Sequence, residues 1–382
     1  MNLRLIQILF LSLLVTAFMG CSDDDMENNL DERFQAAAEN YATIVLANYE
    51  DSFNEASELR DLINDFVADP TEAKFEACKN QWLAARIPYG QTEVFRFYGG
   101  PIDDDDGPEG LLNAWPMDEN FIDYVEGDAM SGLINDPVTY PEITKALLEG
   151  LNESFTEESI FTGYHAIEFL LWGQDLFTSS AGQRPYTDYV VGGTADNQAR
   201  RGEYLKVVAD LLLDHLDSVK SEWEADGAYR ATFLNFSKKE IITKIFTALG
   251  ELSKGELSGE RMFVAVDEQD QENEHSCFAD NTNVDIEQNF QGLVNVYTGT
   301  YTRTNGSVIS GESYSNLAAE ITGDKDQVVL DAIDNARQKI NAIPDPFDQA
   351  ILNSADVVLK AVTALEDLSD AFVDVQVELE NN

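Results

Sequence analysis

The chain has 382 residues, with 71 Asp and Glu against 24 Lys and Arg, so its formal net charge is −47 and its pI is about 4.1. This balance excludes nucleic-acid binding, because phosphate backbones are held by clustered Lys and Arg. A surface this negative repels anions and concentrates cations, which favours a cationic ligand.

The N-terminus has the pattern of a signal peptide over residues 1–20, with an apolar run from Leu5 to Phe18 that is too short to predict a membrane span. Gly20-Cys21 follows and resembles a bacterial lipobox, so we expect cleavage before Cys21 and a lipid on its thiol. The alternative is ordinary secretion. A lipid there would anchor the protein to the membrane without spanning it.

Residues 21–30 begin with Cys-Ser-Asp-Asp-Asp, which is similar to the surface-export signal of Bacteroidetes lipoproteins. Their composition predicts an acidic, disordered tether behind the lipid. We therefore expect an outer-membrane lipoprotein that faces the periplasm or the cell surface.

Apolar residues at spacings of three and four predict helices over most of the remaining chain. In chain order they cover 30–66, 71–98, 141–151, 157–172, 197–226, 237–253, 258–266, 285–296, 314–321, 324–343 and 346–378. Residues 298–311 have a strand-like or turn-like pattern. The fold class is thus all-α, built from helical bundles. A break at Ala225-Asp-Gly227 suggests an N-terminal bundle over 31–228 and a C-terminal one over 229–382.

Two cysteines remain, Cys78 and Cys277, and their spacing does not decide whether they pair. Cys78 lies in an apolar-periodic helix, so a buried free thiol is expected there. Neither has a nearby Cys partner, which argues against a thiolate zinc site.

A histidine and a glutamate three residues apart, His165 and Glu168, lie inside the apolar segment Phe161–Trp172. On a helix both side chains share one face, where they could bind one cation. The structural alternative is a partly buried ion pair, since acids are common in this chain. The spacing alone does not decide between the two.

Four segments, taken in order, resemble the imelysin family. They are Trp82 to Tyr98, Gly100-Pro-Ile-Asp103, the Gly-x-His-x-x-Glu motif at 163–168, and Glu260-Arg-Met followed by Glu274-His-Ser-Cys-Phe-Ala-Asp-Asn-Thr282. The resemblance spans about residues 36–375. It implies two helical bundles with a His-bearing site in a cleft between them, and it extends to iron-regulated and periplasmic iron-uptake proteins. Some members are described as insulin-cleaving metallopeptidases.

The resemblance also implies site residues. His165 and Glu168 match the proposed metal ligands, and Glu93 matches a carboxylate that joins them in iron-uptake relatives. An aspartate completes that set, and the candidates left open are Asp103, Asp118 and Asp123. The second-half motif contributes residues whose role is less defined: Arg261, His275, Ser276 and Asp280.

One imidazole with several carboxylates suits iron, manganese or calcium, and zinc remains an alternative. The zinc-peptidase pattern His-Glu-x-x-His is absent, because residue 166 is Ala, so Glu168 is the one candidate for a peptidase base. The leading hypothesis is an envelope-anchored protein that binds a divalent or ferric ion, with iron favoured, in iron or haem acquisition. The expected partners are the ion or an iron-containing ligand and an envelope receptor or transporter. The alternatives are a metallopeptidase and a peptide-, glycan- or receptor-binding module.

Overall fold

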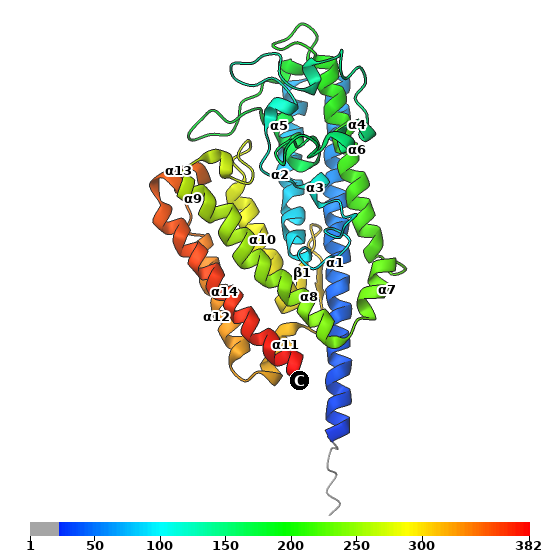
Figure 1. Ribbon diagram of the computed structural model, residues 1–382, viewed down its shortest axis with the longest axis vertical. Coiled ribbons are helices and arrows are strands. Elements are labelled where there is room, and N and C mark those ends of the chain that lie inside the picture. Colours follow the sequence, from blue (N-terminus) through cyan, green and yellow to red (C-terminus); the bar gives the residue numbers. More distant parts are fainter. Residues whose placement is uncertain (1–22) are drawn as a thin grey trace, which may run out of the picture.

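The computed structural model describes residues 23–382, and a 46-residue helix, α1 (Asp23–Ala68), runs along most of its long axis (Figure 1). The predicted signal peptide and Cys21 lie outside the described residues. Helix α1 begins within the segment expected as a tether. No helix among residues 23–382 is both long enough and apolar enough to cross a membrane.

Helices α2 (Glu72–Thr92) and α6 (Gln198–Trp223) pack along α1 and form the first half of the fold. Helix α2 begins where the Thr71 hydroxyl accepts a hydrogen bond from the Lys74 amide, and Pro88 lies within it rather than ending it. Between α2 and α6 the chain forms short elements: η1 (Glu93–Phe95), α3 (Glu109–Leu112), η2 (Glu119–Phe121), η3 (Leu133–Asn135), α4 (Lys145–Leu151), α5 (Gly163–Trp172) and η4 (Tyr186–Tyr189).

The second half places α14 (Ala355–Asn381) against α8 (Lys238–Gly250) and α12 (Lys325–Ile340), on the side of α2 away from α1 (Figure 1). Helix α10 (Thr282–Thr298) packs on α2 and so joins the two halves. The remaining elements are α7 (Ala228–Leu234), η5 (Glu251–Phe263), α9 (Val264–Glu268), η6 (Gln271–Asn273), α11 (Tyr314–Ile321) and α13 (Phe347–Asn353).

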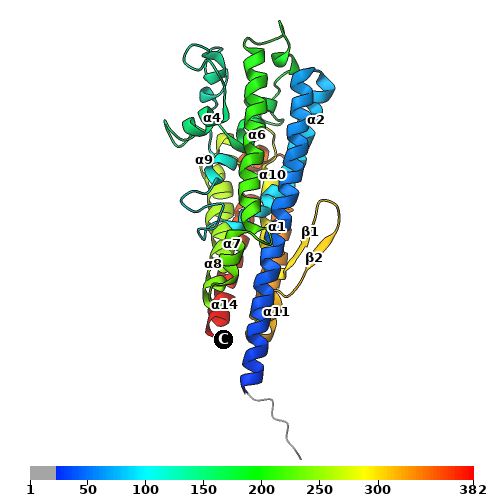
Figure 2. The ribbon, with the colours of Figure 1, turned by 90° about the vertical axis from the view of Figure 1, so that its right-hand side faces the viewer.

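The strand-like stretch forms a short antiparallel hairpin, β1 (Thr300–Thr302) with β2 (Val308–Ser310), in which Tyr301 lies opposite Ile309. It stands beside α1 (Figure 2), where the Tyr301 hydroxyl donates a 2.8 Å hydrogen bond to Asp51. The rest of the described chain is helical or irregular, so the expectation of a mostly helical fold is confirmed.

The buried apolar side chains of both halves form one continuous core cluster. The predicted division into bundles at residues 228 and 229 therefore stays a prediction. Cys78 and Cys277 are both free and buried, as expected for Cys78.

Residues 237–266 differ from the expected pair of helices. Helix α8, the π-helical segment η5 and α9 form one uninterrupted helix from Lys238 to Glu268. The π-helical turns carry the chain through residues 254–257, including Gly255, where the apolar pattern predicted a gap between two helices.

Helix α5 begins at Gly163, although the apolar pattern predicted a start at residue 157. Gly163 has a φ of +82°, and a Cβ atom there would lie 2.5 Å from the carbonyl oxygen of Leu112. A side chain would be strained by the backbone conformation and would also collide with α3. The glycine of the 163–168 motif is thus required to seat α5, and His165 with it.

We expect Gly163→Ala to lower the free energy of unfolding by about 2 kcal/mol or more, because it combines a left-handed backbone with a backbone collision. Gly150→Ala is the matched control, since Gly150 lies in α4 with no neighbouring atom in the way of a Cβ. Urea denaturation should show the control unchanged or stabilised by up to about 1 kcal/mol. Equal stability of the two variants would contradict this account.

Candidate functional site

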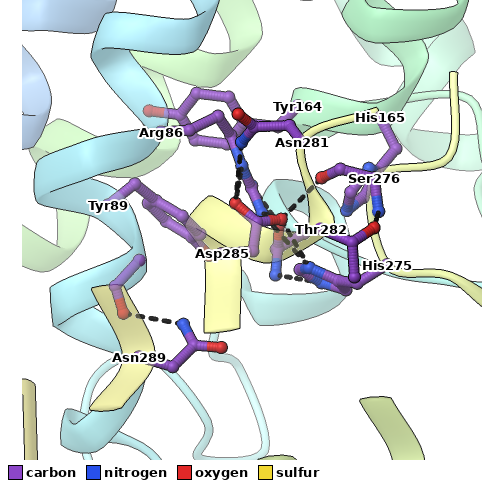
Figure 3. Close-up of polar contacts among 12 residues, drawn as sticks. Arg86, Tyr89, Tyr164, His165, His275, Ser276, Asn281, Thr282, Asp285 and Asn289 are labelled. Atoms are coloured by element: carbon purple, nitrogen blue, oxygen red, sulfur yellow. Dashed lines mark hydrogen bonds and ion pairs between the residues drawn. The ribbon is translucent and has the colours of Figure 1, made fainter. Parts of the chain in front are cut away.

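A buried carboxylate, Asp285 of α10, lies at the centre of a polar cluster between α2 and α10 (Figure 3). Arg86 of α2 donates two hydrogen bonds to it, from Nε at 3.2 Å and Nη2 at 2.7 Å. Both side chains are about 1% exposed. Burial alone would raise the pKa of Asp285, but Arg86 and His275 outweigh it and hold the pKa well below its usual range.

His275 lies between this carboxylate and a second amide. Its Nδ1 is 2.8 Å from Asp285 Oδ2, and its Nε2 is 3.2 Å from Asn113 Nδ2. Because Asn113 Oδ1 accepts from Arg86 at 2.6 Å, the amide nitrogen must face the ring. The histidine therefore carries its proton on Nδ1 and donates it to Asp285.

Two further donors complete the Asp285 environment. The Ser276 hydroxyl donates to Asp285 Oδ2 at 2.5 Å, and Asn281 Nδ2 donates to Oδ1 at 3.1 Å. Ser276 is thus hydrogen-bonded to the carboxylate rather than to a histidine base, and it is not arranged as an activated nucleophile.

The His165–Glu168 pair lies beside this cluster on α5, and both side chains are fully buried. His165 Nδ1 is 2.8 Å from Glu168 Oε2, while the other oxygen, Oε1, accepts a 2.9 Å hydrogen bond from the Ala279 amide. Each oxygen of Glu168 therefore has one partner within the protein. In this geometry Glu168 orients the imidazole rather than sharing one ion with it.

The second ring nitrogen of His165, Nε2, is buried and has no hydrogen-bond partner within the described residues. The His165 ring packs against Trp115 at 4.9 Å and His275 at 4.8 Å between centroids. Burial lowers the pKa of His165 well below 6.5, and it raises the pKa of Glu168 well above its usual range. A neutral imidazole with one open nitrogen is the state that a metal ion requires.

Glu93 belongs to a separate cluster of charges. Arg261 donates to its Oε2 at 2.6 Å, and Arg96 donates to the same atom at 2.8 Å. Burial opposes ionisation, but the two arginines hold the pKa of Glu93 at about 2. Arg261 also donates to Glu256 at 2.8 Å. Glu93 is thus paired with two arginines, and the hydrogen-bond partner of His165 is Glu168 instead.

The three candidate aspartates all have local partners. Asp103 accepts from the Gly100 amide at 2.9 Å, and Asp118 accepts from the Asn120 amide at 3.0 Å as the cap of η2. Asp123 is buried between Arg184, at 2.6 Å, and Arg201, at 2.6 Å. None of the three forms a hydrogen bond or ion pair with His165 in the part of the chain described.

Across residues 23–382, no three His, Cys, Asp or Glu side chains are placed to hold one ion. The residue that fits a metal is His165, whose Nε2 is an orphaned buried atom backed by a carboxylate. The wider ligand set expected from the sequence stays a prediction.

A pocket of about 660 Å³ opens next to His165. Two of its lining residues, Trp115 and His275, are those that pack on the His165 ring. Its lining includes two arginines, both already paired with Glu93. It also includes five glutamates: Glu109, Glu153, Glu157, Glu256 and Glu260. The pocket is therefore acidic and suited to a positively charged ligand.

The residues of the second-half motif lie in different parts of the site. Arg261 and His275 line the pocket, and Ser276 holds Asp285. Asp280 is half-buried with φ +53°, and burial together with nearby Asp175 raises its pKa to about 7.

Sequence reasoning missed Asp285 and Asn113 as members of the site. A signal for Asp285 was present, because Arg86 lies in an apolar helix and a buried guanidinium requires a carboxylate. Asp285 lies in the first turn of α10, where an acid is usually explained by its favourable interaction with the helix N-terminus. For that reason its pairing with Arg86 was not predicted. Asn113 carries no such signal.

The chain is a mostly helical protein with a buried histidine–glutamate pair next to an acidic pocket. Residues 45–372 match the sequence profile of the family described as Imelysin, so the chain belongs to the imelysin family. It is 25% identical over 343 residues to "Iron-regulated protein A" of Synechococcus elongatus, covering 86% of this chain and 81% of that one.

Two solved structures share the fold. One is described as an iron-regulated protein A precursor from Parabacteroides distasonis, with a TM-score of 0.71, 18% identity, and coverage of 91% of this chain and 95% of that one. The other is an imelysin-like protein from Psychrobacter arcticum, with a TM-score of 0.62, 12% identity, and coverage of 89% and 93%. The resemblance to the family inferred from the four segments is confirmed.

We expect Asp285→Asn to lower the free energy of unfolding by about 3–5 kcal/mol, because it leaves the buried Arg86 charge without its counter-ion. Glu287→Gln removes an exposed charge from the same helix and should change stability by no more than about 0.5 kcal/mol. Denaturant titration of both variants tests the difference. A loss below about 1 kcal/mol for Asp285→Asn would show that the pair does not hold α2 to α10.

Proposed function

We propose that this chain is an envelope-anchored protein that binds a metal ion or an iron-containing ligand in iron or haem acquisition, rather than a turnover enzyme. The observation that carries the proposal is the open Nε2 of His165, a buried neutral imidazole whose Nδ1 is held by Glu168. Metal-binding histidines are commonly oriented in this way by a carboxylate on the other nitrogen.

The pocket supports the same proposal by its charge. Its glutamates outnumber its arginines, so the pocket is negatively charged and attracts cations. The net charge of −47 on the whole chain acts in the same direction. His165 is one ligand, and the remaining coordination positions are left to water or to groups that the incoming iron compound carries. The name of the Synechococcus relative, "Iron-regulated protein A", agrees with an iron-related role.

A peptidase role has less support from the site. One oxygen of Glu168 lies 2.8 Å from His165 Nδ1 and the other accepts from the Ala279 amide. Burial raises the pKa of Glu168 well above its usual range, which disfavours the ionised form that a general base requires. We therefore do not propose proteolysis.

We expect the wild-type chain to bind Fe²⁺ or Zn²⁺ in calorimetric titrations carried out without oxygen, and His165→Ala to lose this binding. Glu168→Gln should weaken it about 10–100-fold, because an amide is a weaker orienting partner for the imidazole than the carboxyl group. His215→Ala is the matched control, since His215 lies on α6 near Glu149 and away from the pocket. Thermal unfolding of each variant confirms that it is folded, and equal affinity of wild type and His165→Ala would end the proposal.

The anchoring part of the proposal depends on Cys21, as expected from the sequence. Cys21→Ser should move the chain from the membrane fraction to the soluble envelope fraction, because the lipid is attached to this thiol. Cys78→Ser keeps the lipidation signal and serves as the control. Retention of Cys21→Ser in the membrane fraction would exclude the lipid anchor.

A further inference from the structure

A second group of carboxylates lies where two loops meet the start of α13. The loop after α9 contributes Glu272, Glu274 and Asp280, the loop after α5 contributes Asp175, and the first turn of α13 contributes Asp348. Helices α9 and α13 lie side by side (Figure 1). The loops are tied together by Gln271, which donates to the Asp175 carbonyl at 2.7 Å, and by Gln349, which donates to the Thr178 carbonyl.

Glu274 is the unusual member of this group. It is 1% exposed, and neither of its carboxylate oxygens has a hydrogen-bond partner. The Thr282 hydroxyl approaches it without reaching hydrogen-bonding geometry. A buried carboxyl group with both oxygens unsatisfied is costly and needs a counterpart.

Asp348 faces the same problem. It is 2% exposed, one oxygen accepts from the Gln349 amide at 2.5 Å, and the other, Oδ2, has no partner. Among the described residues, no Lys, Arg or His forms an ion pair with any acid of the group: Asp175, Glu272, Glu274, Asp280 and Asp348.

The acids are brought together by the loop after α5, which accepts hydrogen bonds from Gln271 and from Gln349 of α13. Burial, followed by the charges of Asp348 and Asp280, raises the pKa of Glu274 to about 9. All five groups are acids, so no cation within the group is available to stabilise their ionised form. A positive ligand from solution would do so.

We propose that Glu274 and Asp348 together hold a Ca²⁺ ion that fastens the loop after α9 to the first turn of α13. An oxygen-only set selects a hard cation, and Ca²⁺ accepts irregular coordination by carboxylates, backbone carbonyls and water, whereas Mg²⁺ demands a regular octahedron. Since no three acidic side chains surround one point in residues 23–382, two carboxylates are assigned as ligands, and carbonyl and water oxygens complete the shell.

The consequence of this site lies in the loop that it fastens. Glu274 directly precedes His275 and Ser276, both of which are bonded to Asp285. A cation on Glu274 therefore stabilises the segment that forms one wall of the acidic pocket, and it does so independently of any ion on His165.

The test compares the purified full chain in Ca²⁺, in Mg²⁺ and in chelator. We expect one Ca²⁺ per chain by calorimetry and a rise in Tm of about 2–5 °C at saturating Ca²⁺. Glu274→Gln and Asp348→Asn should each weaken Ca²⁺ binding at least about tenfold and remove the Tm rise. His165→Ala should keep both, which separates this site from the proposed iron site.

Two comparisons guard against misfolding and non-specific binding. Glu274→Gln should be at least as stable as wild type in chelator, because it removes a buried acid without changing shape. Asp105→Asn removes the same charge from the exposed acidic loop and should leave Ca²⁺ binding intact. Unchanged Ca²⁺ affinity in Glu274→Gln, or no Ca²⁺-dependent Tm rise in wild type, would overturn the proposal and show that the carboxyls hold protons instead.

Discussion

The ion pair between Arg86 and Asp285 is the constraint on which the rest of the site depends. It joins α2 to α10 with both charges removed from water, so its geometry must be satisfied completely for the two halves of the chain to pack. Once it is satisfied, the other polar groups follow. The hydrogen bond from Arg86 fixes the orientation of the Asn113 amide, and that amide in turn fixes the tautomer of His275. The His275 ring packs against His165.

This arrangement explains how a chain with a net charge of −47 contains a stable polar interior. The buried arginines are each bonded to carboxylates, as Arg86 is to Asp285, Arg201 to Asp123 and Arg261 to Glu93. Internal charges are therefore close to balance in these clusters, whereas unpaired acids line the pocket and form the buried group around Glu274 and Asp348. The buried arginines of these three clusters supply the counter-charge that a buried carboxylate requires.

The helical fold could be predicted because its apolar spacing is regular, as in α1 and α14. The start of α5 could not, since the pattern before Gly163 is apolar and only a left-handed glycine against Leu112 ends it. The His165–Glu168 pair was found from its spacing. Its division of roles was not, because spacing shows which side chains share a face and not which atoms are already bonded. Glu93 was placed in the site by resemblance, whereas in the structure its charge is matched by arginines from two segments far apart in the sequence.

The π-helical stretch from Glu251 to Phe263 has a consequence for how this chain can vary. Glu256 and Arg261 are five residues apart and bonded, a spacing that aligns on a π turn but not on an α turn. Loss of a single residue here would rotate everything after it by about 100° around the axis unless the π turns tightened to absorb it. Arg261 would then face away from Glu93. Insertions and deletions are generally tolerated in surface loops. Within this helix, a change in the number of residues would move Arg261, which lines the pocket.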